Sequence, residues 1–233
     1  MRDEIARGRK ASEAARAVRA MLDPSDPRFT RIRSLLAASE SMQPAELREI
    51  LDLAWEELGL AATIDQVLMP AMRQIGNFWE TGRCDVAQEH LTTETARGWL
   101  SRVTSLAPAP GPGRPILLAC GPRDLHTLGL EALATLLAHQ SRGCRVLGAR
   151  TPARTLVTAV AATDAAAVVI VSHLSTQRRP AVDALRAAAQ TGVPVFYAGN
   201  AFILPGGRAG VPGTYLGERL APAADRIIET VPG

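Results

Sequence analysis

Cysteine is scarce in this chain of 233 residues, which contains only Cys84, Cys120 and Cys144. Their number is odd and no two of them have CxxC spacing, so the sequence predicts neither a disulfide framework nor a cysteine zinc site. Free thiols are typical of the reducing cytoplasm, and this is the compartment we expect.

Long apolar runs and an excess of one charge are also missing. No stretch approaches the about 18 apolar residues of a membrane span, and the amino terminus lacks the apolar core of a signal peptide. The 26 basic and 23 acidic residues give a net charge of +3, and the basic residues, almost all arginine, are scattered along the chain. A membrane location is therefore not expected, and nucleic acid is not favoured as the main partner.

Apolar residues are plentiful, at 47% of the chain, and their spacing changes along it. From residue 28 to 106 they recur every three or four positions, which predicts four helices and hence a four-helix bundle. Residues 1–27 show a mixed-charge helical pattern and are predicted to form a helical extension. Signals for helix starts and ends occur at Pro44, Thr63 with Asp65, Asp85 with Gln88, Gly59 and Gly82.

The second half, residues 116–233, has the pattern of a doubly wound α/β domain. It follows residues 107–115, "APAPGPGRP", whose composition is that of a linker. Four short apolar runs then alternate with helical stretches: "PILLACG", "CRVLGA", "AAVVIVS" and "VPVFYAG". Continuous apolar strands separated by helices predict a Rossmann-like parallel sheet covered on both faces. "TYLGERL" is a candidate edge strand, and "PAADRIIETV" a candidate last helix.

The loop after the first predicted strand contains Asp124 and His126. Ligands of open parallel sheets bind beyond the carboxyl ends of the strands, where this loop lies. A carboxylate beside an imidazole fixes its tautomer and leaves the far ring nitrogen as a metal ligand. The alternative is that His126 is a surface residue and that Asp124 only caps the helix starting near Thr127.

Two further strands end in residues that fit a ligand site at the same edge. Ser172 and Leu174 follow the third strand, and Gly199 follows the fourth. Together with Ala119 and Gly148, the small Gly199 is expected to leave a slot that runs into the domain.

These residues resemble the base-off, His-on cobalamin-binding domain. The resemblance rests on "DLHTLG", on the Ser-x-Leu of "SHL" and on the glycine after the fourth strand. It implies that His126 is the lower cobalt ligand, that Asp124 is its partner and that Gly129 allows a close approach. Ser172, Leu174 and Gly199 would then line the pocket for the nucleotide tail. The sequence departs from the family at Asn200, where a second glycine is expected.

The predicted bundle contains Trp79 followed, after nine residues, by Glu89 and His90. This pattern ahead of a cobalamin domain is similar to the CarH/LitR class of light-sensing regulators. The resemblance implies that Trp79, Glu89 and His90 surround the upper, adenosyl face of adenosylcobalamin, so that photolysis of the cobalt–carbon bond lets the two domains repack. The alternatives are a core tryptophan with a solvated Glu–His pair, and a corrinoid carrier of a methyltransferase system.

Two departures limit that resemblance. The class has a histidine directly after the tryptophan, where this chain has Glu80. Only about 25 residues precede the bundle, so a MerR-type helix-turn-helix and direct DNA binding by that route are not expected. The prediction is a regulatory protein, not an enzyme, that signals to a partner protein as AerR-like antirepressors do. A homodimer is one arrangement that fits this role, and a light-independent cobalamin sensor or store is a third functional class.

A second chromophore is a minor hypothesis. Photocobilins, which share this plan, hold a linear tetrapyrrole such as biliverdin beside the cobalamin. Arg73, Arg83 and Arg97 could meet its propionates, although helix arginines are usually just solvated.

Overall fold

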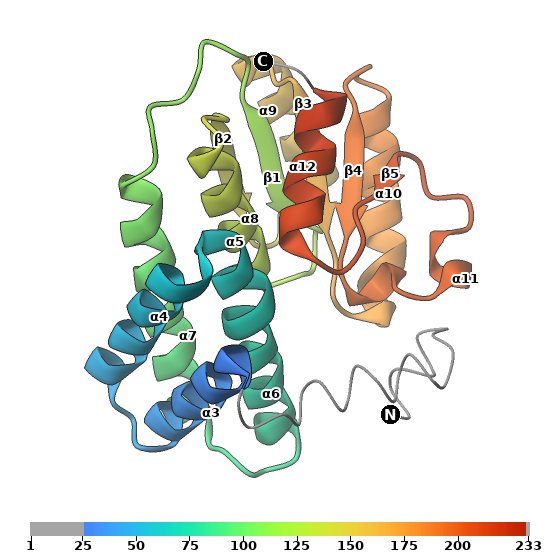
Figure 1. The fold of residues 1–233 in the computed structure, drawn as a ribbon. Helices are drawn as coiled ribbons and strands as arrows, with labels where there is room; N and C mark the ends of the chain where they lie inside the picture. Colours follow the sequence, from blue (N-terminus) through green and yellow to red (C-terminus); the bar gives the residue numbers. More distant parts are fainter. Residues whose placement is uncertain (1–25, 232–233) are drawn as a thin grey trace. The chain divides into compact units, whose positions relative to one another are not determined.

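The computed structural model describes residues 26–231, and the chain divides into two compact units, with the boundary in the sequence between Trp99 and Leu100. The extension predicted for residues 1–27 lies, up to residue 25, outside the described residues. Figure 1 shows a helical unit followed by a unit built on a sheet, which is the fold class that the sequence predicted. No helix within residues 26–231 is long and apolar enough to cross a membrane.

The helical unit follows the predicted pattern of helices closely. Its elements are α3 (Pro27–Glu40), α4 (Pro44–Leu58), α5 (Leu60–Ala62), a π-helical segment (Thr63–Leu68), α6 (Met69–Glu80) and α7 (Val86–Ser105), of which the residues from Leu100 onward belong to the second unit. Asp85 caps α7, because its carboxylate accepts a hydrogen bond of 2.8 Å from the backbone N–H of Gln88. Pro44 opens α4, where a missing N–H costs nothing.

The third predicted helix differs from the expectation at its start. It was predicted to begin at Thr63, but the helical backbone already begins at Leu60, directly after Gly59 with its positive φ of 79°. The residues from Thr63 to Leu68 are π-helical, and the N–H of Met69 bonds to the carbonyl of Ile64, five residues back. Pro70 follows at once; since it has no N–H, the ordinary i to i−4 ladder is interrupted here in any case.

The core of the helical unit is closed by Trp99, which is fully buried. Its indole N–H donates a 2.8 Å hydrogen bond to Asp52 of α4, and its ring meets the edge of Trp55. Ser39 of α3 and Thr92 of α7 share a buried 2.8 Å hydrogen bond. These contacts tie α7 to α3 and α4, as a bundle requires.

The second unit contains a five-stranded parallel sheet with strand order β2-β1-β3-β4-β5. The strands are β1 (Ile116–Cys120), β2 (Cys144–Gly148), β3 (Ala167–Val171), β4 (Val195–Ala198) and β5 (Thr214–Tyr215). The long helices are α8 (Leu128–His139), α9 (Ala153–Thr163), α10 (Arg178–Ala189) and α12 (Leu220–Thr230). Two 3-10 turns, Ser175–Gln177 and Asn200–Phe202, and α11 (Pro205–Arg208) complete the unit.

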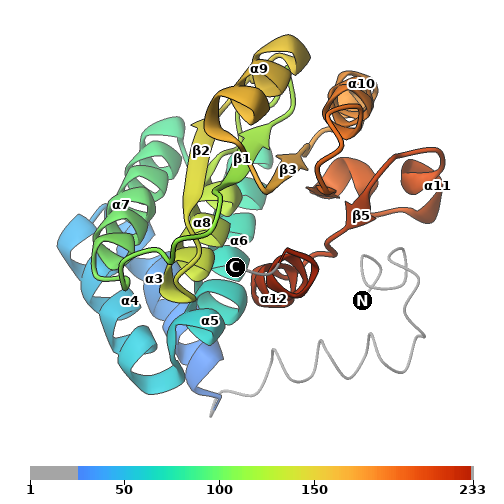
Figure 2. The ribbon, with the colours of Figure 1, turned by 90° about the horizontal axis from the view of Figure 1, so that it is seen from above.

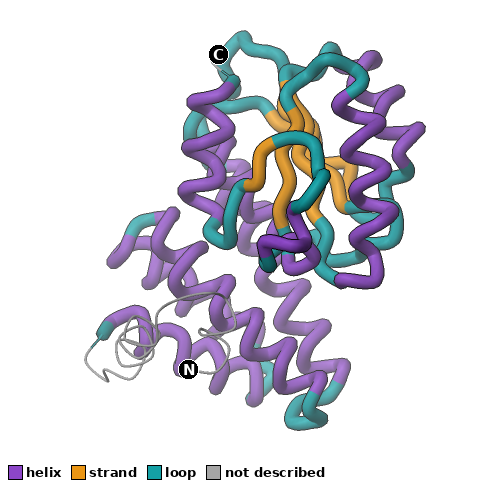
Figure 3. The backbone as a smooth tube through the Cα atoms, turned by 90° about the vertical axis from the view of Figure 1, so that its right-hand side faces the viewer, coloured by secondary structure: helices purple, strands orange, loops and turns teal. Residues whose placement is uncertain are grey.

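Helices cover both faces of the inner strands, whereas β2 at the edge of the sheet is largely exposed, contrary to the buried strand predicted for "CRVLGA". Figure 2 shows α9 and α10 on one face and α8 and α12 on the other, and Figure 3 shows the strands between these helical layers. Leu117 and Ala119 of β1 pack against Leu156 of α9 and Leu185 of α10. Every residue of β1 and β3 is buried, because both faces are covered. The loops at the carboxyl ends of the strands are left to carry the polar residues.

Candidate functional site

The site lies where β1 and β3 end side by side. The backbone N–H of Gly121, directly after β1, donates a 2.8 Å hydrogen bond to the carbonyl of Val171, the last residue of β3. The N–H of Ser172 donates in turn to the carbonyl of Ala198 at the end of β4. The loops that follow the three strands are therefore held at one edge of the sheet.

Asp124 is the centre of this edge, and it is completely buried. Its Oδ1 accepts hydrogen bonds from the backbone N–H of His126 at 2.9 Å and from His126 Nδ1 at 2.8 Å. The imidazole of His126 is 57% exposed, so one side of the pair faces solvent while the other is anchored in the fold. The predicted pairing of Asp124 with His126 is present.

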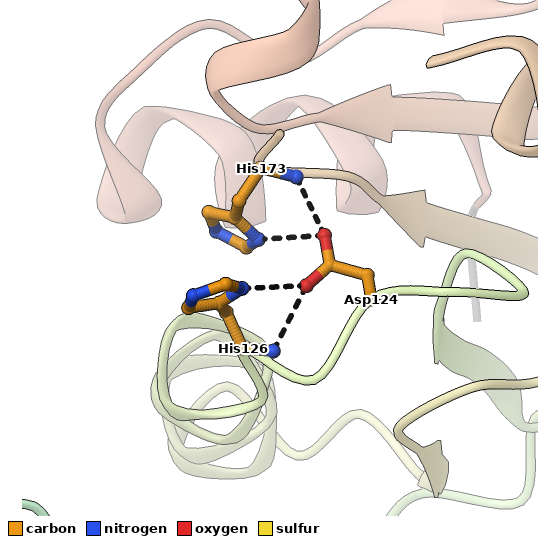
Figure 4. Close-up of side chains that lie close together, drawn as sticks. All are labelled: Asp124, His126 and His173. Carbon is orange, nitrogen blue, oxygen red and sulfur yellow. Dashed lines mark hydrogen bonds and ion pairs between the residues drawn. The ribbon is translucent and has the colours of Figure 1, made fainter. Parts of the chain in front are cut away.

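A second histidine, His173, binds the other oxygen of the same carboxylate. Its backbone N–H and its Nδ1 both bond to Asp124 Oδ2, the latter at 3.1 Å. The His126 and His173 ring centroids lie 5.1 Å apart, and the three side chains form a cluster of potential metal ligands (Figure 4). The sequence analysis treated His173 only as the middle residue of Ser-x-Leu.

The electrostatics of the cluster fix its tautomers. Burial alone would raise the pKa of Asp124, but the hydrogen bonds from His126 and His173 outweigh it and hold the pKa well below its usual range. An ionised carboxylate can only accept hydrogen bonds, so Nδ1 of each ring must carry the proton. In the neutral form of each ring the proton-free nitrogen is Nε2, which lies on the side of the ring away from the carboxylate (Figure 4). Neutral imidazole with an unprotonated Nε2 is the form that binds metals.

Ser172 and Gly199 form the second part of the site. Ser172 is fully buried, and its hydroxyl oxygen has no hydrogen-bond partner within the described part of the chain. Gly199 has a positive φ of 103°, and a Cβ at this position would collide with the carbonyl of Ser172. Only glycine therefore lets the end of β4 approach Ser172 this closely.

The remaining predicted residues of this edge lie in the segments that follow β1, β3 and β4. Gly129 is half-buried in the first turn of α8. Leu174 follows His173 and is 47% exposed, and Leu125, beside His126, is 56% exposed. Asn200, which stands in place of a glycine, is exposed at the start of a 3-10 turn. Apolar side chains at this exposure beside two imidazoles offer a surface for a large, partly apolar ligand.

The other predicted residues lie in the helical unit. Trp79 near the end of α6 is 51% exposed, so it is not part of the core, which contains Trp99 instead. Glu89 and His90 in α7 contact each other, with 3.7 Å between Oε2 and Nε2, and the His90 side chain is 72% exposed. No hydrogen bond or ring contact joins Trp79 to this pair within residues 26–231. Glu80, next to Trp79, is also exposed.

The arginines considered for a bilin make local contacts, which can be described for Arg83 and Arg97. Arg83 stacks on the ring of Phe78 at 4.2 Å, and Arg97 lies 3.5 Å from Glu94 one turn earlier in α7. Such contacts are ordinary for helix arginines.

Cys120 at the end of β1 is a further residue of the site that the sequence analysis did not assign. Its thiol lies 3.6 Å from the carbonyl oxygen of His126, as a donor. Burial, with a smaller effect of the Asp124 and Glu131 charges, raises its pKa to about 12, so it is a neutral support for the loop. All three cysteines are free.

Comparison with known proteins connects this chain with cobalamin proteins. Residues 31–104 match the family described as B12 binding domain. The chain is 33% identical over 171 residues to the HTH-type transcriptional repressor CarH of Myxococcus xanthus, covering 72% of this chain and 57% of that protein. It is 34% identical over 151 residues to the repressor CarA of the same organism, covering 64% and 50%. The chain thus spans about half the length of the curated relatives it matches.

A solved structure shows the same fold. The Methanosarcina barkeri monomethylamine corrinoid protein superposes with a TM-score of 0.70 over 84% of this chain and 96% of that one, at 15% identity. Its low identity limits the comparison to architecture. Together, the family match and the two repressors support cobalamin binding through a CarH-like module.

Proposed function

We propose that this chain is a cobalamin-dependent light sensor that binds adenosylcobalamin base-off, with His126 Nε2 as the lower cobalt ligand. The observation that carries the proposal is the buried carboxylate of Asp124 on His126 Nδ1, 2.8 Å away. It fixes the tautomer and direction of the ligand before the cofactor arrives, as carboxylates do behind metal-bound histidines.

Three features of the sheet unit fit the cofactor. The donor set is a neutral imidazole oriented by a carboxylate, which suits cobalt. The Ser172 hydroxyl is buried without a partner, which is costly unless a ligand supplies one, and the nucleotide tail of cobalamin offers polar atoms. The backbone contact of Gly199 with Ser172 holds this serine in place. His126, Ser172, Leu174 and Gly199 would accordingly hold the lower face and the tail.

The sensor role draws on the helical unit and on the relatives. When bound, adenosylcobalamin supplies a cobalt–carbon bond that visible light breaks. A tryptophan that is 51% exposed, unlike the buried Trp99, suits the covering of a ligand, and we assign Trp79, Glu89 and His90 to the adenosyl face. CarH and CarA are named as transcriptional repressors, which favours a regulator over an enzyme.

We place the output of the sensor on a partner protein in the cytoplasm, with direct DNA binding by this segment not expected. A homodimer is compatible with this role. The proposal does not need biliverdin, for which neither the arginine contacts nor the relatives add support.

The first test combines absorption spectroscopy with small-angle scattering. Protein mixed with adenosylcobalamin in darkness is expected to bind it and, after green light, to change both its absorption and its small-angle scattering profile. Methylcobalamin serves as the control. A corrinoid carrier, the alternative function, would bind either form and show no light-dependent change of shape.

The second test addresses the lower ligand. Electron paramagnetic resonance of the Co(II) form is expected to show one axial nitrogen from protein in wild type and none in His126→Ala. Because His173 presents a second Nε2 on the same carboxylate, the double variant His126→Ala/His173→Ala is measured beside it. Protein nitrogen splitting that survives in the double variant would rule out this edge of the sheet as the ligand site.

The third test concerns the upper face after illumination. Since Glu80 is a poor replacement for an imidazole on Co(III), we expect either His90 or water to take the vacated position. Wild type should then show a bis-imidazole spectrum that disappears in His90→Ala, or an aquo spectrum that responds to pH. A bis-imidazole spectrum that persists in His90→Ala contradicts this assignment.

A further inference from the structure

Asp124 binds two histidines that are 47 residues apart in the chain, and each bonds to one carboxylate oxygen in the same way. Oδ1 accepts from the backbone N–H and Nδ1 of His126, and Oδ2 accepts from the backbone N–H and Nδ1 of His173. Figure 4 shows the carboxylate facing both rings, one on the loop after β1 and the other on the loop after β3. One buried negative charge therefore receives four N–H donors.

The two imidazoles draw on the same charge. A carboxylate that already accepts a hydrogen bond on one oxygen is a weaker acceptor on the other, because both oxygens share its single negative charge. The His126–Asp124 bond must be weaker than it would be if His173 had no ring donor. A metal-bound histidine is made more basic by the carboxylate behind it, so a weaker bond makes Nε2 a weaker electron donor.

We propose that His173 is a positioning residue that tunes His126 through Asp124: by sharing the carboxylate, it lowers the donor strength of His126 Nε2 toward cobalt. The proposal deepens the function given above and rests on it for the identity of the metal. A weaker lower ligand lets the protein release or exchange that bond more readily when the upper ligand changes.

Backbone hydrogen bonds hold the Asp124 carboxylate in place, so the electronic effect of the His173 ring can be measured without moving the carboxylate. The backbone N–H of residue 173 bonds to Oδ2 whatever its side chain is, and that of residue 126 bonds to Oδ1. Asp124 is therefore still anchored at both oxygens when the ring of His173 is replaced. A loss of the ring changes the number of donors from four to three without removing an anchor.

Two variants distinguish electronic sharing from packing. His173→Leu fills similar space but removes the ring donor, whereas His173→Asn places an amide N–H where Nδ1 was and keeps a donor. If His173 acts by sharing the carboxylate, the leucine variant differs from wild type and the asparagine variant restores its behaviour. If it acts by packing alone, the leucine variant, which keeps the volume, stays close to wild type, whereas the smaller asparagine departs from it.

The first measurement uses protein without cofactor. In proton and nitrogen-15 NMR, the Nδ1–H resonance of His126 is expected to move downfield in His173→Leu, as its bond to Asp124 strengthens, and to return in His173→Asn. An unchanged resonance in the leucine variant, or equal shifts in both variants, overturns the proposal. This result does not depend on whether cobalamin binds.

The second measurement uses cobalamin. His173→Leu is expected to bind hydroxocobalamin about three- to tenfold more tightly, below the 10- to 100-fold effect of losing such a partner outright. It should also show a larger axial nitrogen splitting in the Co(II) form, and His173→Asn should match wild type in both. A shifted NMR resonance with unchanged splitting and affinity refutes the tuning. Failure of wild type to bind any cobalamin contradicts the proposed function instead, while the NMR comparison still decides how the carboxylate is shared.

Discussion

The carboxyl edge of the sheet and the α6–α7 region of the helical unit treat their polar residues in opposite ways. At the sheet edge, Asp124 is fully buried, and both of its oxygens are used by two histidines. In the helical unit, Trp79 and His90 are half or more exposed, and the His90–Glu89 contact is a long 3.7 Å. The first region is organised by its own hydrogen bonds, whereas the Trp79 and His90 side chains of the second region are largely exposed.

The two regions therefore differ in how much their functional side chains reduce the stability of the fold. Preorganising His126 requires burying a charge, and that charge is stable only while its donors are present. Exposed side chains such as Trp79 cost the fold little, so they are available for contacts with a ligand. Variants at the two regions should therefore differ in how strongly they affect stability relative to cofactor binding.

The largest effect is expected from Asp124→Asn. The NH2 group of asparagine would face N–H groups that bond to a carboxylate oxygen in wild type, so one side of the cluster would have two donors and no acceptor. We therefore expect a loss of about 3 kcal/mol in the free energy of unfolding and an about 10- to 100-fold weaker affinity for cobalamin. Urea unfolding and a binding titration measure the two. In the helical unit, Asp52→Asn still accepts from Trp99 and should cost under about 1 kcal/mol. An equal loss of stability in Asp124→Asn and Asp52→Asn would contradict the difference between the two regions.

The pH dependence of stability provides a second measure of Asp124. Its pKa is lower in the folded than in the unfolded protein, so its contribution is complete above the unfolded pKa of about 3.9 and is lost as the pH falls below it. Asp124→Asn should remove this part of the acid sensitivity. Unfolding curves between neutral pH and pH 3 test this, and parallel losses in wild type and variant would argue against it.

Gly199→Ala is expected to have the next largest effect. Alanine would be strained at the positive φ of this position, and its Cβ would collide with the Ser172 carbonyl. Together these effects should lower the free energy of unfolding by about 3 kcal/mol. Gly82 of the helical unit also has a positive φ, 69°, but a Cβ there meets nothing within 4 Å. Gly82→Ala should therefore cost only about 1 kcal/mol, from backbone strain alone. Thermal unfolding of the two variants separates strain from collision.

Replacing either of two buried serines by alanine should change the free energy of unfolding in opposite directions. Removing the unpartnered hydroxyl in Ser172→Ala should stabilise the cofactor-free protein by about 1 kcal/mol while weakening cobalamin binding about fivefold. Ser39, equally buried, bonds to Thr92, so Ser39→Ala should destabilise by about 1 kcal/mol and leave binding unchanged. Both are measured by unfolding with and without cobalamin. A stability loss in Ser172→Ala would mean that this hydroxyl has a partner in solution.

The smallest effect on stability is expected at Trp79. Because this ring is 51% exposed, Trp79→Ala should change the free energy of unfolding by no more than about 0.5 kcal/mol. It should nevertheless remove the preference for adenosylcobalamin over methyl- and hydroxocobalamin, measured as the ratio of their dissociation constants. An unchanged ratio would show that Trp79 does not contact the upper ligand.

The periodicity of the sequence was sufficient for most of the fold. Apolar runs such as "AAVVIVS" predicted buried parallel strands, since only a sheet covered on both faces buries every residue of a strand. The start of the third helix was missed, because a π-helical segment has no distinct pattern of apolar residues. Pro70 was the available signal that the regular hydrogen bonding is interrupted there.

At the candidate site, the sequence predicted the pairing of Asp124 with His126, because residues two positions apart in a loop can bond to each other without help from the rest of the chain. The tertiary structure decided that His173 shares this carboxylate, that the Ser172 hydroxyl is buried without a partner, and that Trp79 is outside the core. Each of these depends on which strand ends are neighbours and which helix faces are covered. Local spacing does not encode such contacts, because they form only when segments far apart in the chain pack together.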